Sequence, residues 1–593
     1  MKKPALPFIE TFKNFLPLKQ YFVQNRWPIA LGLMCLLIVD FLQLLIPLVI
    51  KKAIDLLTMK TATAQILIQQ GMIILGLALM IAIFRYVWRY FLLGHSRKVE
   101  KNLRNRIYGH LQTLSLSFYQ KTKTGDLMAR AINDINSIRM ATGMGLVALT
   151  DGIVLGIAAI GFMLSINVRL TLIALIPAPI IIVLTRILTR RMSTGFENVQ
   201  KTFSDLTERA REVFAGIRVI KAYNRESWAH QNIEEEGQRY ISINMGLAKT
   251  LALFFPMMVI FTNIGLTIVI WLGGRLTILG NITTGDFVAF ISYLNLLTWP
   301  MMAMGWVTSL VQRGSASMRR INGILEEITE IKNSAQSIHI PQIRGKIEFK
   351  GLYFTHPGQS FYALKDIHLK IEAGDTIAVV GRVGAGKTTL LQTITRLLDA
   401  PAGTIFLDGW NVRQIPLQTL RKNIGFVTQE VFIFSDTIRN NVLFGRTGVS
   451  QDHLETVLRA ADIFEDTKNL EKGLDTFLGE RGITLSGGQR QRLTIARALI
   501  LDPPILILDD ALSMVDTRTE ERILNQVLSL RRNKTNLIVS HRISTISRAE
   551  RIAVLERGEL VELGTHKNLL EKGRIYTTLY KKQVIAEELE IGV

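Results

Sequence analysis

The first half of the chain contains six long apolar runs, separated by polar segments that are rich in basic residues. Each run approaches the roughly 20 apolar residues that a helix needs to cross a bilayer. Residues Phe8–Trp27 mix aromatic and basic side chains, which is typical of an interfacial segment ahead of the first span. We therefore predict six membrane-spanning helices, at about Ile29–Ile50, Ile68–Phe91, Leu146–Ile166, Leu170–Leu188, Leu247–Leu272 and Phe287–Leu310.

The polar segments between the runs differ in length and charge. The two long ones, Ser96–Gly143 and Thr189–Met245, are rich in Lys and Arg, whereas the segments at the other ends of the spans are short. Basic loops stay on the cytoplasmic side, so we expect both termini in the cytoplasm and a multi-pass protein of the inner (plasma) membrane. The patterns of Val199–Glu212 and Glu234–Met245 are helical, which predicts that the spans continue as long cytoplasmic extensions.

The second half alternates between strands and helices. The runs Gly345–Phe354 and Leu369–Gly381 are predicted strands, and a helix begins at Lys387, which is the alternation of a parallel α/β domain. We accordingly expect a membrane domain over residues 1–327, a linker over 328–344 and an α/β domain over 345–593.

The charge and the cysteine content limit the kinds of molecule that the chain is expected to bind and the bonds that it can form. The net charge is +21, yet the basic residues cluster beside apolar runs and no nucleic-acid-binding motif accompanies them, so we expect no nucleic acid and a lipid bilayer instead. The single cysteine, Cys35, excludes an internal disulfide and is interpreted as a small buried apolar residue.

A phosphate-binding loop follows the apolar strand Thr376–Val380 and opens the helix Lys387–Leu398. Its glycines let backbone N–H groups converge on phosphates, and the helix N-terminus adds positive potential. Lys387 can reach the terminal phosphates, and the Thr388 hydroxyl can bind Mg²⁺. The motif predicts ATP and Mg²⁺ as cofactors, with nucleotide contacts at Gly381, Gly384, Gly386, Lys387, Thr388 and Thr389.

Two further motifs lie downstream. The buried strand Ile505–Leu508 ends at Asp509, a carboxylate placed to hold Mg²⁺ through water. A Ser-Gly-Gly-Gln run precedes the helical stretch Arg490–Leu499 and offers a second anion site at a helix N-terminus, formed by Ser486, Gly487, Gly488 and Gln489.

Together these motifs resemble the ABC exporter half-transporters, and the resemblance covers nearly the whole chain. It implies a membrane α-helical domain of six transmembrane helices with long cytoplasmic extensions, fused to an α/β P-loop ABC nucleotide-binding domain. It also implies that two nucleotide domains pair head to tail. Each ATP would then lie between the phosphate loop of one chain and the signature Ser486–Gln489 of the other.

The resemblance assigns further residues. Gln429 matches the glutamine that contacts Mg²⁺ and faces the membrane part, and His541 matches the switch histidine at the γ-phosphate. Ser513–Asp516 matches the D-loop, and Thr476–Gly482 matches a loop that contacts the membrane helices. His356 stands where the family usually has an aromatic residue, mostly Tyr, that stacks on adenine; Tyr353 is an alternative.

Asp510 departs from the family, which normally has Glu as the catalytic residue at this position. Asp is one methylene shorter, and a displacement of about 1 Å can lower a rate roughly 100-fold. We therefore expect ATP to bind and to be hydrolysed slowly, as in the degenerate-site subunit of a heterodimeric bacterial exporter. The expected partner is a second half-transporter with a catalytic Glu. A homodimer with slow Asp-based hydrolysis is the alternative.

Within the apolar runs, Asp40 and Arg85 are the unusual residues. Ionisable groups inside a membrane are costly and often functional, so we predict that they line the substrate path, with a structural ion pair as the alternative. Residues Phe118–Arg139 are expected at the coupling tip between the second and third spans, where Asp126 could cap a helix.

The expected function is ATP-driven efflux of amphipathic or hydrophobic substrates by alternating access. Drugs, lipids and peptides all fit the sequence. A homodimeric lipid or drug flippase, and an ATP-gated channel or sensor on the same scaffold, are the alternatives.

Overall fold

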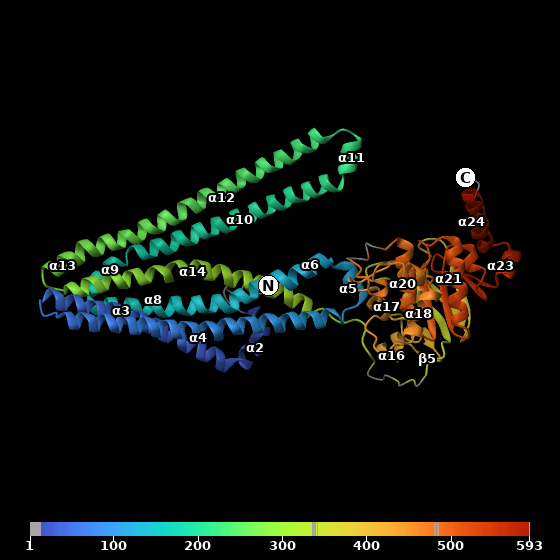
Figure 1. Ribbon diagram of the computed structural model, residues 1–593, viewed down its shortest axis with the longest axis horizontal. Helices are drawn as coiled ribbons and strands as arrows, with labels where there is room; N and C mark the ends of the chain where they lie inside the picture. Colours follow the sequence, from blue (N-terminus) through green and yellow to red (C-terminus); the bar gives the residue numbers. More distant parts are fainter. Residues whose placement is uncertain are drawn as a thin grey trace. The chain divides into compact units, whose positions relative to one another are not determined.

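A computed structural model describes residues 13–334, 338, 340, 342–479, 482 and 485–591. The chain divides into two compact units (Figure 1). The helical unit contains the residues up to Gln112 together with Lys123–Glu327, and the α/β unit contains Thr113–Thr122 together with the residues from Ile328 onward.

The helical unit is built almost entirely from long helices. Its elements are η1 (Leu16–Leu18), α2 (Lys19–Gln24), α3 (Arg26–Thr58), α4 (Ala64–Leu111), α6 (Thr124–Ala129), η2 (Arg130–Asp134), α7 (Ile135–Met140), η3 (Ala141–Gly145), α8 (Leu146–Ile166), α9 (Val168–Ala174), α10 (Pro177–Ala215), α11 (Ile217–Ala222), α12 (Glu226–Ile268), η4 (Val269–Gly273), α13 (Gly274–Ile278) and α14 (Thr284–Leu325).

Five helical segments among the described residues are long and apolar enough to cross a membrane: Arg26–Thr58, Ala64–Leu111, Thr124–Ile166, Val168–Ala215 and Thr284–Leu325. They contain five of the six predicted spans. The predicted span Leu247–Leu272 lies in α12 and η4, where several side chains fall outside the described residues.

The predicted span Leu170–Leu188 is not one helix. It passes from α9 into α10 through Leu175 and Ile176, because Pro177 takes the first position of α10 and restricts the residue before it. Beyond this break, α10 and α12 run side by side and are joined by the short helix α11 (Figure 1). These two helices contain Val199–Glu212 and Glu234–Met245, so the predicted helical extensions are confirmed.

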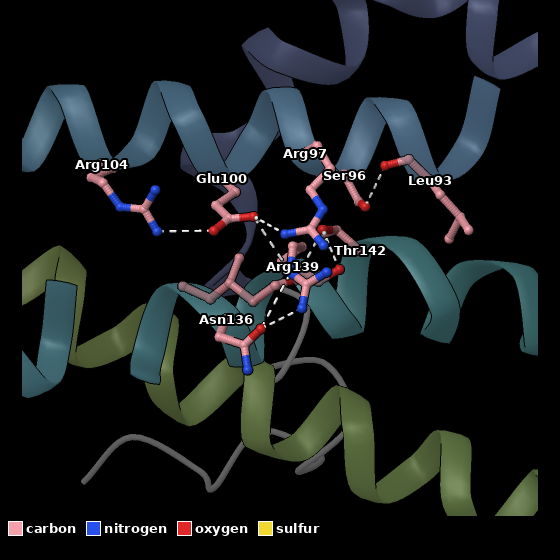
Figure 2. Close-up of polar contacts among 9 residues, drawn as sticks. Leu93, Ser96, Arg97, Glu100, Arg104, Asn136, Arg139 and Thr142 are labelled. Carbon is pink, nitrogen blue, oxygen red and sulfur yellow. Dashed lines mark hydrogen bonds and ion pairs between the residues drawn. The ribbon is translucent and has the colours of Figure 1, made fainter. Parts of the chain in front are cut away.

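Charged side chains fasten the helices of this unit to one another. Figure 2 shows Glu100 on α4 accepting hydrogen bonds from Arg97 (3.1 Å) and Arg104 (2.9 Å), while Arg139 of α7 lies 3.5 Å away. Arg139 also donates to Asn136 at 3.2 Å through Nε. One carboxylate therefore organises three guanidinium groups and links α4 to α7.

The expected coupling region Phe118–Arg139 contains α5 (Leu116–Lys121) and α6. Asp126 does not cap a helix: it lies in the first turn of α6, whose N-cap is Lys123, and it pairs with Arg130 at 2.6 Å. In the α/β unit, the buried hydroxyls of Ser115 and Ser117 donate to Glu330 at 2.8 and 2.7 Å, which fastens the start of α5 to the segment before the first strand.

The α/β unit contains two sheets. The strands are β1 (Ile347–Phe354), β2 (Leu364–Ile371), β3 (Thr376–Val380), β4 (Ile405–Leu407), β5 (Trp410–Asn411), β6 (Ile424–Val427), β7 (Ile505–Asp509), β8 (Thr535–Val539), β9 (Arg551–Glu556) and β10 (Glu559–Gly564). One sheet has the order β2-β1-β4-β5 and pairs antiparallel, and the other has the order β10-β9-β3-β8-β7-β6.

The expected strand Leu369–Gly381 is wrong as one element. It contains the end of β2 and all of β3, separated by a turn in which Gly374 has φ +94° and the Glu372 N–H donates to Asp375 (3.0 Å). The two parts belong to different sheets.

Helices α15 (Lys387–Ile394), α16 (Leu417–Lys422), α17 (Ile438–Leu443), α18 (Gln451–Ala460), α19 (Phe464–Lys468), α20 (Gly487–Leu499), α21 (Thr517–Leu530), α22 (Ile543–Ile546), α23 (His566–Lys572) and α24 (Ile575–Ile591), with the short turn η5 (Gly473–Asp475), complete the unit. Strands β3, β7 and β8 are buried along their whole length. They are parallel to one another and to β6, so their carboxyl ends meet at one edge of the sheet, where α/β proteins bind their ligands.

Candidate functional site

The carboxyl ends of four parallel strands present the predicted nucleotide residues. The phosphate loop follows β3, Gln429 follows β6, Asp509 ends β7, and His541 follows β8. They line one cavity of about 610 Å³ in the α/β unit. The predicted residues that line it are His356, Gly384, Gly386, Lys387, Thr388, Thr389, Gln429, Asp509, Asp510 and His541.

The phosphate loop has a backbone that its glycines require. Gly386 is the N-cap of α15 with φ +98°, and a Cβ there would lie 2.7 Å from the Ala363 oxygen. A Cβ at Gly381 would lie 2.2 Å from the Leu555 oxygen. A side chain at either position would therefore displace the neighbouring backbone, and the bare N–H groups remain free to face an anion.

Lys387 bends back over its own loop. Its Nζ donates to the carbonyl oxygens of Gly381 (2.8 Å) and Arg382 (3.0 Å). Burial lowers the pKa of this ammonium, and the nearby carboxylates of Asp509 and Asp510 oppose that shift. The charge is thus held where phosphate oxygens can replace the carbonyl partners.

Thr388 and Asp509 form the predicted metal-binding pair. The Thr388 hydroxyl donates to Asp509 at 3.2 Å, and Asp509 is only 2% exposed. Burial raises the pKa of Asp509, and the Thr388 hydrogen bond opposes that change. Gln429 adds an amide at the same cavity. A hydroxyl, a carboxylate and an amide oxygen are hard ligands, so this donor set fits Mg²⁺.

Asp510 occupies a fixed backbone position. Its φ is +50°, in the left-handed region, which Asp tolerates better than most residues. Its N–H donates to the Val539 oxygen at 3.0 Å, and its own carbonyl accepts from Ser513 at 3.4 Å. The backbone is therefore fastened to β8 and to the D-loop, and the reach of the carboxylate depends on the side chain alone.

The cavity wall around His356, the expected adenine residue, contains two further aromatic residues. His356 is within 3.2 Å of the Thr389 hydroxyl and packs edge-on against Phe354, and burial lowers its pKa, which favours a neutral ring. Phe361 and Tyr362 also line the cavity and are 61% and 52% exposed. The adjacent aromatic residues Phe361 and Tyr362, shortly after Pro357 in the sequence, could have indicated that this loop adds aromatic side chains to the site.

The alternative adenine residue, Tyr353, does not line this cavity. It packs edge-on against Tyr362, with ring centroids 5.4 Å apart.

The signature residues lie outside the cavity, at the start of α20. Ser486 and Gln489 form a reciprocal capping box, and Gln489 also donates to Asp466 at 2.9 Å. Gly487 and Gly488 pack on the D-loop, where a Cβ would lie 2.8 and 3.0 Å from atoms of Met514. The signature therefore does not share the cavity that the phosphate loop lines in the same chain.

Two buried side chains that the sequence analysis missed connect these loops. Gln491, on α20, donates to the Ser513 hydroxyl (2.9 Å) and accepts from the Met514 N–H (2.8 Å). Glu520, 1% exposed, accepts from Arg542, which follows the switch histidine and donates to the Val515 oxygen at 2.6 Å. The switch loop, the D-loop and the signature helix therefore share one hydrogen-bonded network.

Part of the exporter loop Thr476–Gly482 lies outside the described residues, namely Glu480 and Arg481. Among its described residues, Phe477 is 59% exposed and forms an isolated bridge with Thr437.

The helical unit contains a second, larger cavity of about 1110 Å³. Its walls combine aromatic rings with polar and charged groups, including Phe196, Glu197, Phe254, Trp299, Trp306 and Arg313. Asp40 and Arg85 do not line it, and within the described chain they form no ion pair with each other. Asp40 is instead 1% exposed inside α3.

Comparisons with known proteins agree with this architecture. Residues 29–301 match the ABC transporter transmembrane region, and residues 364–513 match the ABC transporter family. The Multidrug resistance-like ATP-binding protein MdlA of Buchnera aphidicola (subsp. Schizaphis graminum) is 36% identical over 97% of this chain and 99% of its own length. The ATP-dependent lipid A-core flippase of Syntrophus aciditrophicus is 35% identical over 84% of this chain and 83% of its own length.

A solved structure of a bacterial Atm1-family ABC exporter with ATP bound superposes with a TM-score of 0.75. It is 25% identical and covers 95% of this chain and 98% of that one. The match therefore extends over the membrane region and the ATP-binding region together. This chain belongs to the ABC transporter family and is an exporter half-transporter, a multi-pass membrane protein in which a helical transmembrane domain is fused to an ATP-hydrolysing domain.

Proposed function

We propose that this chain is one half of a heterodimeric exporter of hydrophobic or amphipathic molecules, and that its own phosphate loop binds ATP but hydrolyses it slowly. The observation that carries the proposal is Asp510: a short carboxylate on a fastened backbone, beside an otherwise complete set of phosphate and Mg²⁺ ligands. Domain limits of 1–327, 328–344 and 345–593 form part of the same proposal.

The proposed roles follow from position. The loop from Gly381 to Thr389 holds the phosphates, with Lys387 on the terminal ones. Thr388, Asp509 and Gln429 hold Mg²⁺, which when bound neutralises phosphate charge. His541 contacts the γ-phosphate, and His356, Phe361 and Tyr362 hold the adenine.

Hydrolysis by this chain's own site is slow because the carboxylate that should orient the attacking water does not reach it. The Asp510 backbone is held to Val539 and Ser513, so the missing methylene is not compensated by a shift of the chain. A misplacement on the order of 1 Å lowers the rate roughly 100-fold.

The signature Ser486–Gln489 serves the partner's ATP. It opens a 13-residue helix with bare glycine N–H groups, and it does not line this chain's own cavity. An intact signature beside a weak catalytic carboxylate indicates that the fast site of the complex combines this signature with the phosphate loop of a different chain.

The test is the Mg-ATPase of the full chain purified alone in liposomes, with ATP binding measured in parallel. We expect ATP to bind and hydrolysis to stay near the rate of the Lys387→Ala control. Robust hydrolysis at ordinary exporter rates would overturn the degenerate-site proposal. Mixing Lys387→Ala chains with Ser486→Arg chains tests the homodimer, because only a self-pairing protein regains one complete site in the mixture.

The cavity in the helical unit is the proposed substrate site. Two tryptophans, Trp299 and Trp306, give it broad apolar surface, while Glu197 and Arg313 provide polar anchors, a combination suited to amphipathic molecules. ATP-dependent transport of an amphipathic dye into inverted vesicles, lost in Trp299→Ala with Trp306→Ala, would support export over the channel or sensor alternative.

A lipid flippase is the second candidate, because relatives that are named lipid A-core flippases match more than four-fifths of the chain. Fluorescent-lipid translocation in the same vesicles distinguishes it from dye export.

A further inference from the structure

The α/β unit contains a further cavity of about 460 Å³, which shares no lining residue with the nucleotide cavity. The phosphate loop contributes Arg382 to its wall, and β10, at the end of its sheet, contributes Val561 and Glu562. The rest of the wall comes from α24 and the turn before it, where α23 and α24 lie side by side (Figure 1). Four residues of α24, spaced three and four apart on one face of the helix, belong to the wall: Ile575, Thr578, Leu579 and Lys582.

This cavity is basic. Arg382, Arg574 and Lys582 line it, and the side chains of all three are exposed. Among the residues that the structure describes, none of the three side chains forms an ion pair or a hydrogen bond. Like charges around one cavity repel one another, whereas an anion that enters the cavity is attracted by all three.

Glu562 is the one carboxylate among the described residues of this wall, and it is 7% exposed. Its two oxygens accept the N–H groups of Ile575 (3.2 Å) and Tyr576 (2.9 Å), the first two residues of α24. The carboxylate therefore fastens the start of the helix to β10. Three cations and one carboxylate give the wall a net charge of +2, which matches the charge of about −2 on a phosphate monoester at neutral pH.

The rest of the wall fits the organic part of such a molecule. Val561, Ile575 and Leu579 provide apolar surface beside the cations. The two guanidinium groups, on Arg382 and Arg574, are suited to bidentate hydrogen bonds with phosphate oxygens. The volume also falls in the range of roughly 300–1,000 Å³ that is typical of small-molecule sites.

We propose that this cavity binds a small phosphate monoester, and that its occupancy lowers the affinity of the chain for ATP. The site lies beside the nucleotide cavity without forming part of it. It does not depend on the proposed slow hydrolysis at Asp510 or on the identity of the partner chain.

The phosphate loop connects the two sites. Arg382 lines the basic cavity, while the next two residues, Val383 and Gly384, line the nucleotide cavity. The Arg382 carbonyl oxygen also accepts the hydrogen bond from Lys387 Nζ at 3.0 Å. The Arg382 charge thus adds to the potential that attracts the ATP phosphates, and a bound phosphate monoester cancels it. The two ligands therefore weaken each other by the same factor, of about fivefold.

A fluorescent-nucleotide titration of the full chain in phosphatidylcholine liposomes tests the proposal, with phenyl phosphate as the probe. This molecule combines the dianionic group with one apolar ring. We expect the Kd for the nucleotide to rise about fivefold and then to reach a plateau as the probe concentration increases. The plateau requires a separate site, because a probe that competes at the phosphate loop raises the apparent Kd without limit.

A second arm distinguishes two sources of the phosphate group. Phosphatidic acid is added to the liposomes in place of phenyl phosphate. A plateau with phenyl phosphate supports a site for soluble phosphate esters, and a rise with phosphatidic acid alone supports the same site for a lipid headgroup.

Arg574→Gln combined with Lys582→Gln should abolish the response to the probe. The Kd without the probe should stay within about twofold of the native value, because neither residue lines the nucleotide cavity and distant exposed charges are screened. The matched control is Lys581→Gln, which removes an exposed cation of α24 outside the cavity and should keep the full response. The melting temperature of the double variant should not fall, since two like charges are removed from one cavity.

Three results would overturn the proposal. They are an apparent Kd that rises without a plateau, a response that survives the double substitution of Arg574 and Lys582, and no response to either phenyl phosphate or phosphatidic acid.

Discussion

Lengthening the carboxylate at position 510 is the most direct test of the slow-site reasoning. The Asp510 backbone is anchored by its N–H to Val539 (3.0 Å) and has φ +50°. In Asp510→Glu the added methylene should therefore extend the carboxylate toward the γ-phosphate position rather than shift the chain. We expect kcat to rise about 100-fold, equivalent to about 2.7 kcal/mol of barrier, with the KM for ATP nearly unchanged.

The same substitution should have a small stability cost. Glu is less tolerant than Asp of a left-handed backbone, and such strain is worth about 1 kcal/mol. The melting temperature should therefore fall slightly while the rate rises, a combination that general stabilisation of the protein would not produce.

The assay is phosphate release from Mg-ATP by the full chain in liposomes, measured on copies of this chain that are crosslinked in pairs. In such a pair each phosphate loop faces the signature of the other copy, whichever chain is the natural partner. Asp510→Asn should show no gain, and Asp510→Glu combined with Lys387→Ala should be inactive. A rate for Asp510→Glu within threefold of the native rate, with ATP binding intact, would refute the argument that side-chain length limits this site.

Three further outcomes are expected. Phe361→Ala and Tyr362→Ala should each weaken ATP binding by up to about tenfold in a fluorescent-nucleotide titration, because each removes a ring from the proposed adenine end of the cavity. The control is Trp410→Ala, which removes an exposed ring outside the cavity and should leave ATP binding unchanged. Glu520→Ala should destabilise the chain by about 3 kcal/mol in thermal unfolding, since it removes a buried carboxylate and leaves Arg542 and Thr545 without the acceptor that they share. The neighbouring Glu521→Ala, which removes a partly exposed ion pair, should cost less than about 1 kcal/mol. Hydrogen bonds from Ser117 and Ser115 lower the pKa of Glu330. These bonds should therefore stabilise the fold fully above the ordinary Glu pKa of about 4.3, and their contribution should disappear as the pH falls through the lowered pKa. Melting curves of Ser115→Ala with Ser117→Ala should accordingly differ from the native chain near neutral pH and converge with it in acid; a constant difference would contradict the assignment.

The sequence by itself determined the class of the protein and most of the nucleotide site. Apolar runs of membrane length and the glycine–lysine loop are local signals, because bilayer thickness and phosphate geometry act on contiguous residues. For the same reason Lys387 and Thr388 could be named from their motif and Asp509 from the end of an apolar strand, whereas His541 was named only through the resemblance to the family. The break at Pro177 and the turn at Gly374 are also local features. The apolar pattern alone, however, predicted one continuous span across Pro177 and one continuous strand across Gly374.

Only the tertiary structure decided which distant residues meet. Phe361 and Tyr362 join His356 at one cavity because β1 and β2 pair antiparallel, which brings the loop that connects them back to the phosphate loop. Glu520 meets Arg542 through the packing of α21 against α22. Asp40 and Arg85 were expected to line the substrate path, yet Asp40 is buried inside α3 and neither residue lines the cavity of the helical unit. The physical reason is that helix packing, set by side-chain shape along whole helices, fixes these neighbours, and no local pattern in the sequence encodes it.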